Sequence, residues 1–278
     1  MKANSGLLLL PLLATRGLAV GAGEVDWVLE STAAWQPRDS QVEWVLNDQM
    51  WLAGGWFGSH EAPPRDVWTS VDGKEWKLVN PDAPWVHSDL AMGIAFKDRL
   101  WVMGGWYKGR LPGCSASNQV WSSADGKEWK METANARWSP RAYHQSVVIN
   151  GRIYVFGGGN YTPKYCTTND VWSSADGVNW TCETSSAPWA PRMWFGAAVY
   201  RNRIWVLGGW CKETDNHGDV WHSADGKNWQ RLETKTCWKS RHEHSVLVFK
   251  DKLWVFGGHA RPLSSEVWSL NLPPDWNP

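Results

Sequence analysis

Residues 138–180 read WSPRAYHQSVVINGRIYVFGGGNYTPKYCTTNDVWSSADGVNW, and variants of this stretch recur four more times along the chain. Each copy contains a Gly-Gly pair, and the first residues of these pairs are Gly54, Gly104, Gly157, Gly208 and Gly257. A tryptophan stands nineteen residues before each of these glycines, at Trp35, Trp85, Trp138, Trp189 and Trp238. A period near fifty residues that extends through the chain indicates a repeat architecture.

Each copy predicts four short strands. The first is an apolar run such as SVVI at 146–149, and a polar turn joins it to the second strand, which ends at Gly-Gly. The third begins with Val-Trp, and a Ser-Ala-Asp-Gly turn leads to a fourth strand centred on a tryptophan eight residues farther along. Asp-Gly between aromatic-bearing strands is typical of a two-residue hairpin, because glycine tolerates positive φ. Four-stranded units repeated about an axis form an all-β propeller.

The order of motifs within a copy resembles the kelch repeat. Pro140 and Arg141 precede His144, the second strand ends in Gly-Gly, Asp170 precedes Val-Trp, and a spaced tryptophan follows. The resemblance covers residues 25–278 and implies a five-bladed kelch-type β-propeller with four antiparallel strands per blade. The chain departs from the family in one respect, because kelch propellers usually carry six or seven blades and five copies are visible here.

The repeats predict one domain over residues 23–278, because a single repeat cannot bury its own faces. The expected blades lie near residues 35–80, 85–133, 138–184, 189–233 and 238–272. The segment VDWVLE at 25–30 precedes the first copy, and its Trp27 matches the fourth-strand tryptophan of a repeat. We therefore expect residues 25–30 to close the ring by pairing with the last strand of the fifth blade, near residues 267–270.

Residues 1–22 have the pattern of a secretory signal peptide. Lys2 precedes the apolar run GLLLLPLLA, and small residues follow it. This run is too short to span a bilayer, and nothing else in the chain approaches a membrane-spanning length. The pattern predicts a secreted or periplasmic protein without an integral membrane segment after cleavage.

The composition limits the classes of partner. The chain has 28 basic and 28 acidic side chains, with no cluster of Lys or Arg, so nucleic acid is not expected as a partner. Twenty of the 25 tryptophans follow the repeat and are expected to pack within and between blades. Of the others, Trp44 lies on a strand, and four are candidates for ligand binding: Trp56, Trp106, Trp194 and Trp210.

The five cysteines are Cys114, Cys166, Cys182, Cys211 and Cys237. Export favours disulfides, and an odd number leaves at least one thiol unpaired. The positions of these cysteines in the repeat suggest two pairs, Cys114–Cys166 and Cys211–Cys237, with Cys182 as the remaining thiol.

The loops after the second strands carry nearly all the variation between copies, and variable loops on a rigid scaffold usually hold binding residues. Four copies place an arginine on this face: Arg38, Arg141, Arg192 and Arg241. These arginines are candidates for ligand binding at the mouth of the central pore. Their recurrence also suits a structural role, in which they pair with acidic neighbours or cap loop carbonyls.

Two residues after the arginine position, the copies differ from one another. The five residues there are Ser40, Leu90, Tyr143, Trp194 and Glu243. An aromatic wall, a phenol and a carboxylate could hold a small polar ligand such as a sugar or a sugar acid. The same groups could perform acid–base chemistry, with Glu243 as the base and Tyr143 or His244 as the acid.

Three histidines raise the alternative of a divalent metal. His242 and His244 lie two apart, so a regular strand would place both side chains on one face. His259 follows Gly-Gly in the same copy and could approach them. Three histidines with an open position would suit zinc, copper or iron, although our first expectation is a protein without a cofactor.

The sequence thus predicts a secreted kelch propeller that binds a carbohydrate or a protein surface on its loop face. The alternative is an enzyme that acts on a sugar or another small polar substrate, mutarotase-like or metal-dependent. Secreted kelch-like proteins include a sialic-acid mutarotase, but propellers host many functions. A purely structural interaction protein is a third interpretation.

Overall fold

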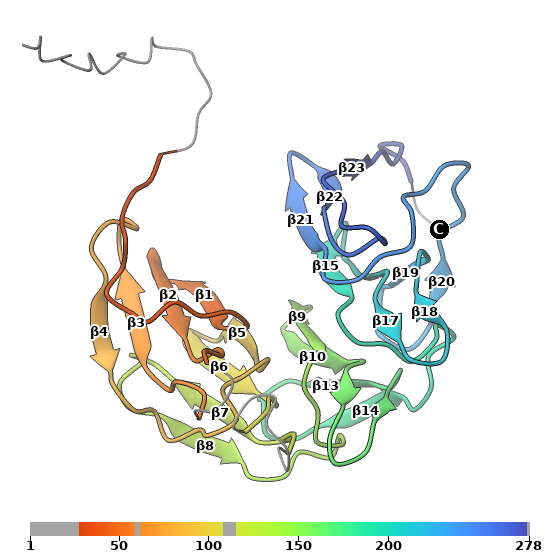
Figure 1. The fold of residues 1–278 in the computed structure, drawn as a ribbon. Helices are drawn as coiled ribbons and strands as arrows, with labels where there is room; N and C mark the ends of the chain where they lie inside the picture. The colour runs from red at the N-terminus through yellow and green to blue at the C-terminus, as the bar shows by residue number, and fades with distance from the viewer. Residues whose placement is uncertain (1–27, 59–61, 108–114, 277–278) are drawn as a thin grey trace, which may run out of the picture.

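The computed structural model describes residues 28–58, 62–107 and 115–276, and all the regular structure in them is β. The strands form five blades arranged about a common axis (Figure 1). No helix in this part of the chain is long and apolar enough to cross a bilayer. The predicted all-β kelch-type propeller with five blades is confirmed.

Blades one to four each contain four antiparallel strands, and the described part of blade five contains three. Blade one comprises β1 (Val42–Leu46), β2 (Gln49–Ala53), β3 (Val67–Ser70) and β4 (Lys77–Asn80). Blade two comprises β5 (Met92–Phe96), β6 (Arg99–Met103), β7 (Val120–Ser123) and β8 (Lys130–Thr133). Blade three comprises β9 (Gln145–Ile149), β10 (Arg152–Phe156), β13 (Val171–Ser174) and β14 (Thr181–Thr184). Blade four comprises β15 (Gly196–Tyr200), β16 (Arg203–Leu207), β19 (Val220–Ser223) and β20 (Gln230–Arg231), and blade five comprises β21 (Ser245–Phe249), β22 (Lys252–Phe256) and β23 (Val267–Leu270).

The two kinds of turn within a blade differ from the expected assignment. The two-residue hairpin with positive φ at both residues joins the first and second strands, as at Lys97-Asp98 and Asn150-Gly151. The Asp-Gly connection is longer. In blade two, Asp125 Oδ1 accepts the backbone N–H groups of Lys127 and Glu128, and the fourth strand begins after Trp129. The Asp-Gly hairpin prediction was therefore wrong, since the side-chain cap holds a wider turn.

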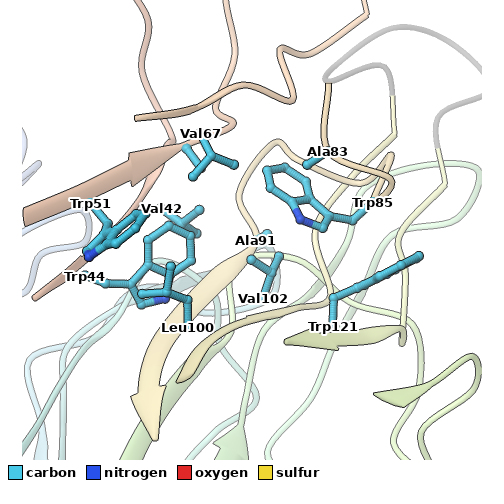
Figure 2. Packing of buried hydrophobic residues seen from close by; sticks show 11 residues of the cluster. Val42, Trp44, Trp51, Val67, Ala83, Trp85, Ala91, Leu100, Val102 and Trp121 are labelled. Atoms are coloured by element: carbon cyan, nitrogen blue, oxygen red, sulfur yellow. The ribbon is translucent and has the colours of Figure 1, made fainter. Parts of the chain in front are cut away.

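The core lies between neighbouring blades. Figure 2 shows the interface of blades one and two, where Trp44 of β1 packs with Leu100 and Val102 of β6. Trp44 also donates its indole N–H to the carbonyl of Trp101 at 3.1 Å. In blades one to four, the tryptophan before the first strand meets the fourth-strand tryptophan edge to face, as at Trp85 and Trp129, whose rings lie 5.5 Å apart at 82°. The repeated tryptophans therefore pack the blades, as expected.

The predicted closing strand is not found in the described residues. Residues 28–30 belong to no strand, and β23 pairs only with β22 among the described strands. Ser31 instead donates to the carbonyl of Gly73 at 2.9 Å, and Glu30 lies 3.4 Å from Lys74, so this segment lies on blade one. Blades one and five face each other across an opening (Figure 1). Residues 25–27 and the predicted signal peptide, 1–22, lie outside the described residues.

The described cysteines are all free thiols. The predicted Cys211–Cys237 disulfide is wrong, because Cys211 Sγ lies 2.9 Å from Thr214 Oγ1 while Cys237 Sγ lies against the carbonyl of Gly218. Cys166 is free in the structure, and its predicted partner Cys114 lies outside the described residues. Cys182 is a free thiol, as expected.

Candidate functional site

The five residues that break the repeat all adopt the same backbone conformation. Their φ angles are 60° at Ser40, 55° at Leu90, 57° at Tyr143, 52° at Trp194 and 53° at Glu243. Non-glycine residues seldom adopt this left-handed region. Neighbouring copies are joined here, because the N–H of Glu243 donates to the carbonyl of Trp194 at 3.0 Å and that of Leu90 to the carbonyl of Ser40 at 3.2 Å. The left-handed conformation at these five positions thus brings the variable side chains of successive blades side by side.

Tyr143 and Trp194 belong to a group of aromatic side chains, which we call the aromatic cluster. Its members are Trp106, Tyr143, Tyr161, Tyr165, Trp194 and Trp210. The ring of Tyr143 lies 4.9 Å from that of Trp194 and 5.1 Å from that of Trp106, both edge to face. Trp106 and Tyr143 are buried, whereas the other four are half-buried and reach the surface. The aromatic cluster therefore has a packed floor and an accessible rim.

Two small hairpins after the second strands supply most of this rim. One, formed by β11 (Gly159–Asn160) and β12 (Cys166–Thr167), carries Tyr161 and Tyr165 between its strands. The other, formed by β17 (Trp210–Cys211) and β18 (Asp215–Asn216), begins with Trp210. The Tyr165 hydroxyl accepts the N–H of Lys212 at 2.6 Å and ties the two hairpins together.

Sequence reasoning missed Tyr161 and Tyr165, although a signal was present. Gly159 stands directly after Gly-Gly, where three other copies have Trp56, Trp106 and Trp210. A Cβ at Gly159 would lie 2.0 Å from the carbonyl oxygen of Cys166, so only glycine fits there. A third glycine in place of an expected tryptophan indicates that the aromatic side chain comes from farther along the loop.

Polar groups flank the aromatic cluster on the side of blade five. The ring of His242 stacks on Trp194 at 5.5 Å and 26°, and its Nδ1 lies 2.5 Å from Asn216 Oδ1. The exposed carboxylate of Glu243 lies 4.0 Å from His242 Nε2. The structure thus brings Tyr143, Trp194 and Glu243 to one region, as the sequence suggested.

Trp56 lies apart from the aromatic cluster. It forms an antiparallel bridge with Asp39 in blade one, whereas Trp106 and Trp210 pack with Tyr143 and Tyr161. Of the four candidate tryptophans, the structure therefore brings together Trp106, Trp194 and Trp210.

The four arginines are buried structural residues, which is the alternative that their recurrence allowed. Arg192 donates to both oxygens of Asp219, at 2.6 and 2.9 Å, and to the carbonyl of Gly208 at 2.8 Å. Arg38 and Arg141 make the same two bonds to Asp66 and Asp170, whereas Arg241 donates to one oxygen of Glu266 and to Ser264. Each guanidinium also donates to the first carbonyl of the Gly-Gly pair in its own blade. The ligand-binding role predicted for Arg38, Arg141, Arg192 and Arg241 is not supported.

Blade two shows that the arginine and its acid form one unit. Ser88 stands at the arginine position, and Gln119 stands where the other blades have Asp or Glu. In the other blades the acid pairs with the arginine and also accepts the indole N–H of the third-strand tryptophan. Gln119 retains only the second of these roles and accepts the N–H of Trp121 at 3.1 Å. Blade two therefore lacks both the arginine and the carboxylate whose charge the arginine balances in the other blades.

The expected acid–base set does not converge. His244 is buried against Trp238, 5.6 Å away, inside the interface of blades four and five. Its burial, together with Arg241, lowers the pKa of His244 to about 4, so the imidazole is neutral at pH 7 and has no imidazolium proton to donate. Tyr143 is buried among aromatic rings. The predicted roles of His244 and Tyr143 as acids are therefore not supported.

The predicted histidine metal site does not form either. The rings of His242 and His259 lie 4.9 Å apart, but His244 points to the blade interface. The positive φ of Glu243 interrupts the strand alternation that would have placed His242 and His244 on one face. Within the described ranges, no group of three His, Cys, Asp or Glu residues is arranged to hold a metal.

The buried histidines predict a loss of stability in mild acid. Burial lowers the pKa of His144 to about 3 and that of His244 to about 4, whereas an unfolded histidine titrates near 6.5. The unfolded chain therefore binds more protons below pH 6.5, and the free energy of unfolding should fall from there to about pH 4. Urea unfolding at pH 7.5, 6 and 5 measures this slope. An equal free energy of unfolding at these three pH values would contradict the neutral, buried state of both histidines.

Parts of the chain are similar in sequence to known proteins. The sequence model of the KLHDC2/KLHL20/DRC7 Kelch-repeats domain matches residues 90–275. The alpha chain of the flagellar outer arm dynein of Chlamydomonas reinhardtii is 38% identical over 93 residues, which are 32% of this chain and 2% of the dynein chain. Spermatocyte protein spe-26 of Caenorhabditis elegans is 30% identical over 170 residues, which are 58% of this chain and 28% of spe-26. The matches thus span under a third of either relative. Because the family model covers more than half of the chain and the blades carry its motifs, the chain belongs to the kelch-repeat family.

Proposed function

We propose that the chain is an exported binding protein that docks a partner protein on the rim of the aromatic cluster. The observation that carries this proposal is the gathering of Tyr161, Tyr165 and Trp210 from two hairpins with Trp194, which lies just before β15. Tyrosine and tryptophan are enriched among the few residues that carry most of the binding energy at protein interfaces, because each buries a large apolar area against the partner. Kelch propellers are scaffolds for ligand binding and protein interaction, which agrees with this assignment.

A carbohydrate is the second candidate ligand, because flat aromatic faces and a carboxylate occur together. The rings of Tyr161 and Trp210 are nearly parallel, at 25°, and the exposed Glu243 lies at the edge of the cluster. Aromatic rings can stack on the apolar face of a sugar while a carboxylate accepts its hydroxyl groups.

Catalysis is a weaker proposal than binding. Neither the acid–base set Glu243, Tyr143 and His244 nor the histidine set converges on one point. Export is proposed from residues 1–22, whose apolar core and small residues suit a cleaved leader.

Photocrosslinking tests this proposal. The full chain is expressed in cells, and the protein is recovered from the medium, with a photoreactive amino acid in place of Tyr165. We expect crosslinked adducts of defined protein mass, and we expect Trp194→Ala with Trp210→Ala to reduce them at least tenfold, as for interface hot spots worth about 2 kcal/mol or more. The same crosslinker in place of Lys127, an exposed residue in a turn between β7 and β8, is the control.

The other outcomes identify the alternatives. Binding of the unmodified chain to a glycan array, lost in Trp210→Ala, would replace the partner protein by a carbohydrate. Equal adducts from the Tyr165 and Lys127 positions would remove the aromatic cluster as the docking site. Recovery of the chain from the cells alone would contradict export.

A further inference from the structure

The side of blade five that faces away from blade four is apolar, and none of the described residues covers it. The residues that form this open flank of blade five are Leu247, Phe249, Trp254, Phe256 and Val267. In the other blades, the side chains at these positions pack against the next blade. Phe249 is 57% exposed, whereas its counterpart Tyr200 is 3% exposed. Val267 is 59% exposed, whereas Val67, Val120 and Val171 are fully buried.

The opposite side of blade one also has no other blade against it within the described ranges. Val45 is 71% exposed and points away from blade two, which its neighbour Trp44 contacts. Val71 and Leu78 are exposed on this blade, and Trp76 is half-buried. Together with Met50, these residues form the open flank of blade one. The chain thus presents two apolar flanks, one at each end of its array of blades.

A repeated contact joins each blade to the next. The glycine in the Asp-Gly turn of one blade lies flat on the second-strand aromatic ring of the preceding blade. A Cβ on this glycine would lie 2.4 Å from Trp51 at Gly126, 2.1 Å from Trp101 at Gly177 and 2.6 Å from Tyr154 at Gly226. Blade five has no such turn, and Trp276 covers Trp205 of blade four in its place, with the rings 5.6 Å apart.

Each open flank carries one half of this contact. Trp254 on blade five is the ring without a turn over it, and among the described aromatic rings it stacks on Phe256 of its own strand alone. Gly73 on blade one is the turn without a ring beneath it, since a Cβ there would meet only Met50 of the same blade, at 3.2 Å. The blades that carry these two halves, blade five and blade one, lie on opposite sides of the opening in Figure 1.

We propose that the two open flanks are the docking surface for one further kelch-type blade, supplied by a partner polypeptide. The occupant is continuous with the interfaces already present, because it repeats their chemistry on both sides. The glycine in the Asp-Gly turn of this added blade lies on the ring of Trp254. The aromatic ring on its second strand lies beneath Gly73. Its apolar inner strand covers Leu247 and Phe249. Only a β-sheet unit with both features satisfies both flanks at once.

A tethered blade tests the fit of this surface. The full chain is extended at its C-terminus by a flexible linker and a second copy of residues 189–237, which supplies both halves of the contact. A tether raises the effective concentration of the added blade to the millimolar range. Terminal repeats exchange fastest because they lack a neighbour. We therefore expect the amide hydrogens of β21 to exchange roughly tenfold more slowly in the extended chain than in the natural one.

Two controls isolate the docking contact. In the first control, valine replaces the turn glycine of the added copy, which is the counterpart of Gly226. This change should return the exchange rate of the β21 amides to that in the natural chain. Leu247→Asp in the docking surface should do the same. Leu263→Asp should leave the protection intact, because Leu263 is exposed on a loop away from this flank.

Three results would overturn the proposal. Unchanged exchange of β21 in the extended chain would show that the flank accepts no blade. A concentration-dependent dimer of the natural chain in sedimentation, abolished by Leu247→Asp, would identify a second copy as the occupant. An intramolecular disulfide in the Val45→Cys, Leu247→Cys chain would show that blades one and five close directly on each other.

Discussion

Replacement of Arg192 by methionine is expected to lower the free energy of unfolding by about 3–5 kcal/mol. The guanidinium is buried and donates to both oxygens of Asp219, to the carbonyl of Gly208 and to that of Ala190. Methionine fills much of the same volume but leaves the Asp219 carboxylate half-enclosed without its cation. The cost arises from this unpaired charge and the unpaired carbonyls rather than from lost packing.

Urea unfolding of purified variants measures this effect, and the chain offers a matched control. Arg231 forms an ion pair with Glu233 at 3.3 Å, with both side chains exposed. Arg231→Met should change the free energy of unfolding by about 1 kcal/mol or less, since solvent screens exposed pairs. A loss for Arg192→Met no larger than that for Arg231→Met would show that the buried pair does not hold the blade together.

A double substitution separates the charge from the packing. Blade two already lacks both members of the pair, with Ser88 and Gln119 in their places. Arg192→Met combined with Asp219→Leu removes the unpaired carboxylate, so it should recover part of the loss. A double variant less stable than Arg192→Met alone would contradict this account.

The pH dependence of the same pair has a definite sign. Burial alone would raise the pKa of Asp219, but the hydrogen bonds and charge of Arg192 outweigh it and hold that pKa below its usual value. A carboxyl with a lowered folded-state pKa contributes stability above its unfolded pKa near 3.9, and this contribution is lost as the pH falls further. The difference between wild type and Arg192→Met should therefore be constant above about pH 5 and shrink below pH 4.

The fold could be predicted from the sequence because its signals are periodic. A single tryptophan nineteen residues before a Gly-Gly pair could arise by chance, but five occurrences of this spacing define a repeat. Trp85 and Trp129, two repeat positions of the second copy, pack together in the cluster between blades one and two. The closing strand was less predictable. The match of Trp27 to the fourth-strand tryptophan position shows only that this segment could form such a strand. In the structure, Glu30 and Ser31 instead contact polar groups on blade one.

The candidate site could be predicted only in part. Tyr143, Trp194 and Glu243 were found because they break the repeat, and such differences point to the variable face. The side-chain directions were not predictable, because the left-handed conformation at Glu243 separates His242 from His244. The arginines were ambiguous for another reason. Their partners, such as Asp170 for Arg141, lie 29 residues away, and only the folded blade brings them together.

Gly177→Ala is expected to destabilise the chain by about 2–4 kcal/mol. A left-handed residue costs about 1–2 kcal/mol when it acquires a Cβ, and Gly177 has a φ of 76°. The Cβ would also lie 2.1 Å from the ring of Trp101 in blade two. Because this ring is buried and held by a hydrogen bond to the carbonyl of Phe96, blades two and three must move apart to admit the methyl group.

Gly73→Ala is the matched control, since Gly73 has the same place in blade one and a φ of 75°. Its Cβ would meet only the flexible end of Met50, so the expected cost is the backbone term alone, about 1–2 kcal/mol. Urea unfolding of the two variants therefore separates the backbone conformation from the contact between blades. If Gly73→Ala proved as damaging as Gly177→Ala, the turn of blade one would already be covered by an aromatic ring in solution. Equal losses would then mean that the open flank of blade one is occupied in the natural chain.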